Sequence, residues 1–146
     1  MKKLLVILSF CTFSVAKARS VNVAEIILKN FNTAYPQAQK VIWTDHETFS
    51  EARFEQGDIK MRVGYDLSGN IISSERVYPE RMLSPFILGK VKQKFDNVRI
   101  NTITEVSNAD GLKYYLTLEG EKKWYVIECD SYGDISVIEK LNKLTN

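Results

Sequence analysis

Few residues in the chain are of a type that could catalyse a reaction or bind a metal ion. His46 is the sole histidine, and it follows Asp45 in a predicted turn. A zinc site of the usual kind needs several His or Cys ligands, and no serine motif such as G-x-S-x-G is present. We therefore favour a solvated turn residue over a catalytic base. The sequence predicts a protein that is not an enzyme, with no metal site and no cofactor.

The two cysteines, Cys11 and Cys129, lie in different parts of the chain. Cys129 could act as a nucleophile only with a base held close to it. It alternates with apolar residues in a predicted strand, so we expect a buried structural thiol. Cys11 would suit a lipoprotein signal, but the bulky Phe10 before it fits an anchor signal poorly.

Two short motifs, Asp66-x-x-Gly69 and Asp130-x-x-Gly133, place an acidic residue three positions before a glycine. A calcium loop of the EF-hand type needs oxygen ligands at several alternating positions and a closing glutamate, and these are absent. A turn in which glycine adopts a positive φ explains the spacing more simply. We therefore predict turns at both motifs.

A group of aromatic, apolar and basic residues suggests a binding surface. If Tyr125, Ile127 and Cys129 face the core of a regular strand, Trp124 and Val126 point the other way. Trp, Tyr and Arg are the residues most enriched in binding hot spots. The predicted partner-binding residues are Trp124, Val126, Tyr115 (or its neighbour Tyr114) and Arg62. Two alternatives stay open: this face packs on another sheet, or the register is shifted by one and Trp124 is core.

The N-terminus has the pattern of a secretory signal. Lys2 and Lys3 precede an apolar run from Leu4 to about Ala16, which is too short to span a bilayer as a helix. Small residues allow cleavage after Ala16 or after Ala18, and we favour the second. Residues 1–18 are thus the predicted signal peptide of a periplasmic or secreted protein, with no stable membrane anchor after cleavage.

The charge of the chain argues against nucleic-acid binding. The sequence has 20 basic and 18 acidic residues. Cleavage after Ala18 removes Lys2, Lys3 and Lys17, leaving 17 basic against 18 acidic residues. A nucleic-acid surface would need Lys and Arg clustered on one face. The expected partner is instead another protein in the cell envelope or outside the cell.

An offset of 64 residues aligns the two halves of the sequence, for example Val63 with Ile127 and Gly69 with Gly133. The same offset pairs Phe31 with Phe95. Each half reads as a helix followed by four strands bounded by turn residues. The predicted strands are 40–44, 48–55, 59–65 and 70–77 in the first half, and 98–106, 112–119, 122–129 and 134–141 in the second.

The sequence therefore predicts an α+β fold of two tandem units, at residues 19–79 and 80–146. Each unit would be one helix packed on a four-stranded antiparallel meander.

The first unit contains a set of aromatic, proline and turn residues at fixed spacing: Phe31, Tyr35-Pro36, Ala38, Val41-x-Trp43, Phe54 and Tyr65-Asp66-x-x-Gly69. In these residues it resembles the PepSY-like domains, which are also described as β-lactamase-inhibitor-protein-like and occur mainly in exported proteins of Bacteroidetes. The second unit departs from the pattern, because Phe95-Asp96 replaces Tyr-Pro and the Val-x-Trp step is missing near residues 103–105. The resemblance implies a tandem domain whose open sheet face binds another protein.

These observations predict a non-enzymatic exported binding module that uses an open sheet face to bind a macromolecule. The alternative, suggested by the resemblance alone, is an inhibitor or regulator of an exported hydrolase such as a protease.

Overall fold

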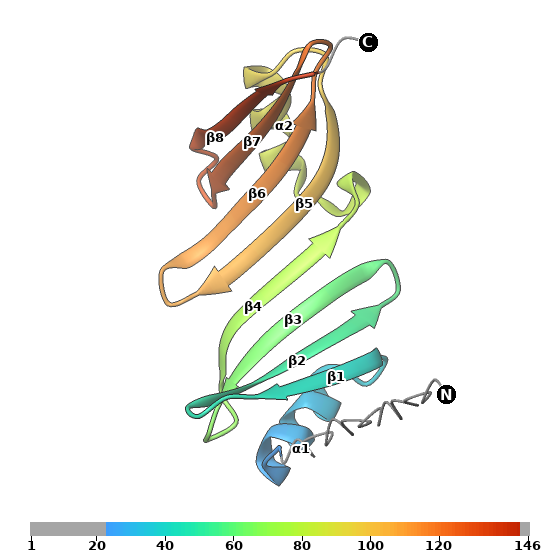
Figure 1. The fold of residues 1–146 in the computed structure, drawn as a ribbon, viewed down its shortest axis with the longest axis vertical. Coiled ribbons are helices and arrows are strands. Elements are labelled where there is room, and N and C mark those ends of the chain that lie inside the picture. Colours follow the sequence, from blue (N-terminus) through green and yellow to red (C-terminus); the bar gives the residue numbers. More distant parts are fainter. Residues whose placement is uncertain (1–22, 144–146) are drawn as a thin grey trace, which may run out of the picture.

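The computed structural model describes residues 23–143, so the predicted signal peptide lies outside the described residues. The elements follow one another as α1 (Glu25–Ala34), β1 (Gln39–Asp45), β2 (Phe49–Gln56), β3 (Ile59–Asp66), β4 (Ile71–Tyr78), a 3₁₀ turn η1 (Glu80–Met82), α2 (Pro85–Lys94), β5 (Arg99–Asn108), β6 (Gly111–Glu119), β7 (Lys123–Asp130) and β8 (Ile135–Asn142). The described part of the chain is thus mostly strand, with two short helices (Figure 1).

The eight strands form one antiparallel sheet, in which spatial order follows chain order from β1 to β8. The predicted fold of two tandem units, each with its own four-stranded sheet, is therefore wrong. It fails at the β4–β5 pair, where Arg76 lies opposite Glu105 and Tyr78 opposite Ile103. These backbone hydrogen bonds join what the sequence suggested were two sheets into a continuous, twisted one (Figure 1).

Below, residues 23–78 are called the N-terminal half and residues 80–143 the C-terminal half. Both helices lie against the same side of the sheet, α1 over the N-terminal half and α2 over the C-terminal half (Figure 1). Each covers a separate hydrophobic cluster. The buried members are Ile27, Phe31, Ala52, Phe54, Val63 and Tyr65 under α1, and Tyr78, Leu83, Ile87, Val91, Ile100, Ile103, Tyr114, Leu116, Leu118, Ile127 and Cys129 under α2.

The offset between the halves is not constant, which corrects the gap-free alignment predicted from the sequence. The helices begin at Glu25 and Pro85, 60 residues apart, whereas β3 and β7 begin at Ile59 and Lys123, 64 apart. Phe31 therefore corresponds to Val91 rather than to Phe95. The extra four residues enter between the helix and the second strand of the half, where β5 has 10 residues and β1 has 7.

The two Asp-x-x-Gly motifs form turns, as predicted. In the first, a carboxylate oxygen of Asp66 accepts hydrogen bonds from the backbone N–H groups of Ser68 and Asn70, at 2.9 and 2.8 Å. Gly69 has a φ of +87°, and Gly133 in the second turn has the same φ. Hydrogen bonding from Asn70 lowers the pKa of Asp66, so the carboxylate stays ionised as an acceptor in this turn.

Within residues 23–143, no helix is long and apolar enough to cross a membrane.

Candidate functional site

Within residues 23–143, the two side chains that the sequence offers for catalysis, His46 and Cys129, are not assembled into a catalytic centre. His46 is exposed in the β1–β2 hairpin and stacks on Phe49, with ring centroids 4.1 Å apart. Cys129 is fully buried, and burial raises the pKa of its thiol, which disfavours the nucleophilic thiolate. Among the described residues, no three His, Cys, Asp or Glu side chains could together hold a metal ion.

The side of the sheet away from the helices, here called the open face, is the candidate site. Side chains of a strand alternate between the two faces. In β7, Ile127 and Cys129 are buried under α2, whereas Trp124, Val126 and Glu128 are half-buried on the open face. No helix in the described part of the chain covers this face (Figure 1).

Three of the four predicted binding residues lie together on β6 and β7. Val126 is directly opposite Thr117, two residues along β6 from Tyr115. Trp124 lies opposite Glu119 on β6 and Leu141 on β8. The sequence alternative Tyr114 is buried in the core instead. We call the set Tyr115, Thr117, Trp124, Val126 and Leu141 the aromatic patch.

Charged residues border the aromatic patch and fix its edges. Lys143 places its Nζ 5.4 Å from the centroid of the Trp124 ring and 2.8 Å from Oε1 of Glu119. Lys113 pairs with Glu128 at 2.9 Å, and this contact lowers the pKa of the Glu128 carboxyl. An apolar centre with charged residues at its edge is the arrangement found at many protein interfaces.

The fourth predicted residue, Arg62, is not part of this cluster. It lies on β3 in the N-terminal half, and three strands separate it from β7. At about 4.8 Å per strand step, roughly 19 Å separate β3 from β7. The structure therefore places Arg62 and Trp124 on one open face but not in one small site.

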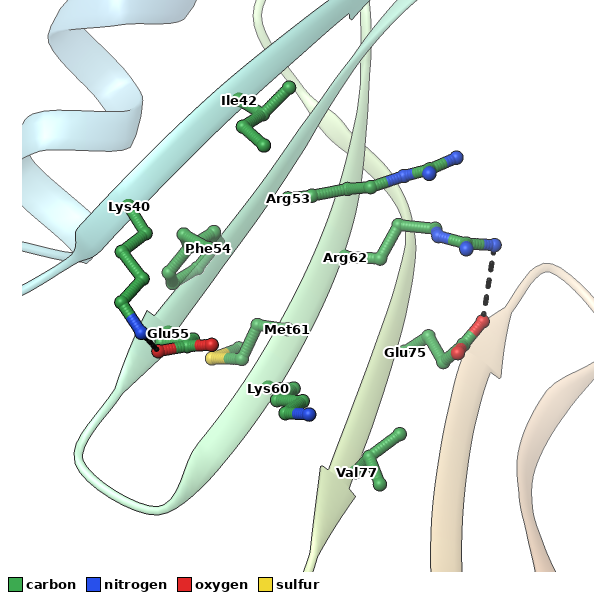
Figure 2. A pocket seen from close by; sticks show the side chains of 10 residues that line it. All are labelled: Lys40, Ile42, Arg53, Phe54, Glu55, Lys60, Met61, Arg62, Glu75 and Val77. Carbon is green, nitrogen blue, oxygen red and sulfur yellow. Dashed lines mark ion pairs between the residues drawn. The ribbon is translucent and has the colours of Figure 1, made fainter.

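Arg62 instead belongs to a hollow on the open face of β1–β4, with a volume of about 380 Å³. Directly opposite Arg62 on β2 lies Arg53. Figure 2 shows the two side chains extending side by side from neighbouring strands. The other lining residues are Lys40, Ile42, Phe54, Glu55, Lys60, Met61, Glu75 and Val77.

Arg53 was not singled out from the sequence, although a signal for it exists. In β2 the charged residues Glu51, Arg53 and Glu55 alternate with Ala52 and Phe54. This period of two predicts a charged row on one face of a strand, next to the row that carries Arg62.

Comparison with known proteins defines the fold but gives no established function. No family profile and no curated protein matches the sequence. Solved structures do match. A BLIP-like protein from Bacteroides fragilis has a TM-score of 0.60 at 15% identity, with 86% of this chain and 90% of that chain covered. A protein from Bacteroides eggerthii, provisionally assigned to the periplasm, has a TM-score of 0.59 at 13% identity, with 84% and 90% covered.

A DUF2874 family protein from Bacteroides uniformis has a TM-score of 0.58 at 14% identity, over 82% of this chain and 88% of that chain. At these identities the likeness concerns the fold alone. The predicted resemblance to β-lactamase-inhibitor-protein-like folds of Bacteroidetes is confirmed at that level. The narrower assignment to PepSY-like domains is not addressed by these structures.

Proposed function

We propose that this protein is a non-enzymatic exported binding module that binds another protein across the open face of its sheet. The observation that carries the proposal is the aromatic patch. Trp124 and Val126 are only half-buried, although their neighbours Ile127 and Cys129 are fully buried. A large aromatic side chain left accessible on an uncovered sheet is a typical binding anchor.

The extent of the open face supports a macromolecule as the partner. The aromatic patch and the hollow beside Arg62 are roughly 19 Å apart by strand spacing. A ligand that contacts both must therefore be larger than a metabolite. The likeness of fold to a BLIP-like protein supports a narrower form of the proposal, in which the partner is an exported hydrolase that this chain inhibits or regulates.

The export part of the proposal is supported by the signal pattern and by the fold shared with a protein provisionally assigned to the periplasm. Intact-mass measurement of protein recovered from the periplasm tests it. We expect a mature N-terminus at Arg19, or at Lys17 if the earlier site is used. Recovery of a chain that retains residues 1–16 would contradict export by signal cleavage.

The binding part is tested with the mature protein as bait in an envelope extract. Trp124→Ala should weaken capture of a specific partner, because loss of a hot-spot aromatic costs about 2 kcal/mol or more of binding energy. Tyr132→Ala is the matched control, since this aromatic lies in the β7–β8 turn, outside the aromatic patch, and is 81% exposed. Thermal melts of all three proteins come first, to show that each variant is folded.

Equal capture by wild type, Trp124→Ala and Tyr132→Ala would contradict the proposed surface. If the captured partner is a hydrolase, its activity with and without the mature protein distinguishes inhibition from simple binding.

A further inference from the structure

We propose that the hollow on the N-terminal half receives a carboxylate side chain of the protein partner, held by Arg53 and Arg62. The inference rests on the proposed binding function and adds the chemistry of the partner to it. The partner segment would carry a Glu or Asp beside apolar residues. The two arginines are called the arginine pair below.

The arginine pair is an unfavourable arrangement for folding alone. Arg53 and Arg62 lie directly opposite each other on β2 and β3, and like charges in that position destabilise a sheet. They share one carboxylate, since Oε1 of Glu51 lies 2.8 Å from Nε of Arg53 and 3.6 Å from Nε of Arg62. Glu75 adds a contact of 3.5 Å to Nη1 of Arg62.

Both guanidinium groups keep binding capacity on the side of the solvent. The side chains of Arg53 and Arg62 are 54% and 45% exposed, whereas that of Glu51 is 14% exposed. Glu51 therefore contacts both arginines through their Nε atoms. A guanidinium group has five N–H donors in a planar fork, so outer donors remain for a second carboxylate, in the bidentate geometry that arginine favours.

The net charge of the hollow favours a bound group that carries a single negative charge. Its lining contains four cations, Lys40, Arg53, Lys60 and Arg62, and two carboxylates. Glu51, which contacts both arginines, makes the third carboxylate. The site is thus one positive charge in excess, which a partner carboxylate neutralises and a phosphate dianion would exceed.

The walls of the hollow explain why an apolar neighbour should accompany the carboxylate. Ile42 is 63% exposed although it lies within a strand, and it is directly opposite Arg53. Val77 lines the other side of the hollow on β4. Figure 2 shows Ile42 and Val77 flanking the charged groups. An aliphatic residue next to the acidic one would cover part of this apolar lining while the carboxylate reaches the arginine pair.

The test follows the side-chain Nε–H signals of arginine by NMR in the ¹⁵N-labelled mature protein. The probe is N-acetyl-Leu-Glu-Leu-amide, and the matched peptide carries Gln in place of Glu. We expect the glutamate peptide to shift the Arg53 and Arg62 signals saturably, and the glutamine peptide to shift them far less. Arg53→Gln or Arg62→Gln should weaken binding about fivefold, as expected for an exposed ion pair.

Arg81→Gln is the control variant, because Arg81 is an exposed arginine paired with Asp58 outside the lining of the hollow. It should bind the glutamate peptide as the wild type does. Equal shifts with both peptides, an unchanged affinity in the Arg53 and Arg62 variants, or tighter binding of inorganic phosphate would overturn the inference. A negative result in this experiment would not contradict the proposed function, because Trp124→Ala tests that function at the aromatic patch and not at the arginine pair.

Discussion

The two halves of the molecule have corresponding elements, but the open face is rich in charge in the N-terminal half and has an aromatic patch in the C-terminal half. At an offset of 64 residues, β2 and β3 of the N-terminal half correspond to β6 and β7 of the C-terminal half. At four open-face positions the first pair of strands has a charged residue where the second pair has an uncharged one. The correspondences are Glu51 with Tyr115, Arg53 with Thr117, Lys60 with Trp124, and Arg62 with Val126.

The cores of the two halves differ as well, but in a way that conserves packing. The N-terminal cluster is aromatic, with Phe31 and Phe54 packed edge to face at 5.0 Å. The C-terminal cluster is mainly aliphatic, and it has Leu118 where the first has Phe54. The C-terminal half thus has a smaller residue at the position of Phe54, but a larger one, Leu116, at the position of Ala52. Cores tolerate such exchanges when total volume is kept, whereas no packing reason requires the open faces to differ.

The largest expected effect on stability comes from truncating corresponding core residues in the two halves. Phe54→Ala should lower the free energy of unfolding by about 3–5 kcal/mol, and Leu118→Ala by about 2–5 kcal/mol. Because β4 pairs with β5, both variants should still unfold in one transition. Denaturant melts can follow each half separately, since Trp43 reports on the N-terminal half and Trp124 on the C-terminal half. Different midpoints for the two tryptophans, isolated by Trp→Phe substitution, would show that the halves are energetically independent.

The second largest effect on stability is expected at the two glycine turns that face the helices, and its size should differ between the halves. A Cβ on Gly69 would lie 2.8 Å from Nδ2 of Asn30, and that amide is fixed by a 2.9 Å hydrogen bond to the Gly69 carbonyl. A Cβ on Gly133 would instead meet the flexible side chain of Lys90, also at 2.8 Å. Both glycines have positive φ. Gly69→Ala should therefore cost about 2–4 kcal/mol of stability and Gly133→Ala about 1–2 kcal/mol.

Gly57→Ala is the control for backbone strain in this comparison. Gly57 has a φ of +58°, and nothing lies within 4 Å of the position that a Cβ would occupy there. The substitution should cost about 1 kcal/mol. If all three variants melt alike, the contacts with the helices contribute nothing and strain alone explains the glycines.

Two buried tyrosines provide the next test, because only one has a hydrogen-bond partner among the described residues. Tyr78 donates to Oε2 of Glu105 at 2.8 Å, whereas the Tyr65 hydroxyl is buried without a partner in that part of the chain. Tyr78→Phe should cost about 1.5–3 kcal/mol, as expected for a hydrogen bond to a charged group. Tyr65→Phe should leave stability unchanged or raise it by up to about 1 kcal/mol. A large loss for Tyr65→Phe would mean that its hydroxyl makes a stabilising contact after all.

The same pair predicts how stability depends on pH. Burial raises the pKa of Tyr65 to about 12, and burial with the Glu105 contact raises the pKa of Tyr78 further. Below the ordinary tyrosine pKa of about 10, both phenols are neutral in the folded and unfolded states. Above it the unfolded chain ionises first, so stability should fall as pH rises from about 10 to about 12. Tyr65→Phe should reduce this alkaline loss in chemical denaturation at about pH 9 and about pH 11.

Much of the local structure could be predicted from the sequence, because it is encoded locally. Every predicted strand end lies within two residues of an observed one, since alternating apolar residues and turn residues mark both ends. The same alternation assigned Ile127 and Cys129 to the core. The two Asp-x-x-Gly turns were predicted from spacing alone, because glycine tolerates the positive φ that they require.

The single sheet could not be predicted in the same way. The β4–β5 pairing is made by backbone hydrogen bonds between Ser74–Tyr78 and Ile103–Ser107, and backbone groups are identical in every sequence. The uneven offset between the halves was missed because the irregularity in β5 appears only in its pairing with β6, where the register shifts between Ile100 and Thr102. Arg62 was singled out without Arg53, because the register that sets them opposite each other is a property of the fold.

The smallest effect on stability is expected from exchanging the two open faces at one position. Arg62→Val and Val126→Arg each give one half the residue of the other. Both positions are away from the core clusters. The Arg62 side chain is 45% exposed and lies 3.6 Å from Glu51 and 3.5 Å from Glu75, and ion pairs at the surface are worth at most about 1 kcal/mol. Each variant should therefore keep the free energy of unfolding within about 1 kcal/mol of wild type. Thermal and urea melts measure this, with Ile127→Ala as a core control expected to lose about 2–5 kcal/mol.

A small change in the free energy of unfolding would show that the fold does not require the difference between the two open faces. If charge and apolarity on the open face are interchangeable for folding, the contrast between the arginine pair and the aromatic patch needs an explanation outside the fold. Binding supplies one, because Val126→Arg would then place a charge in the centre of the patch and impair partner capture while leaving the melt unchanged. A loss of more than about 2 kcal/mol in Val126→Arg would instead identify the aromatic patch as a surface that the fold itself needs for packing.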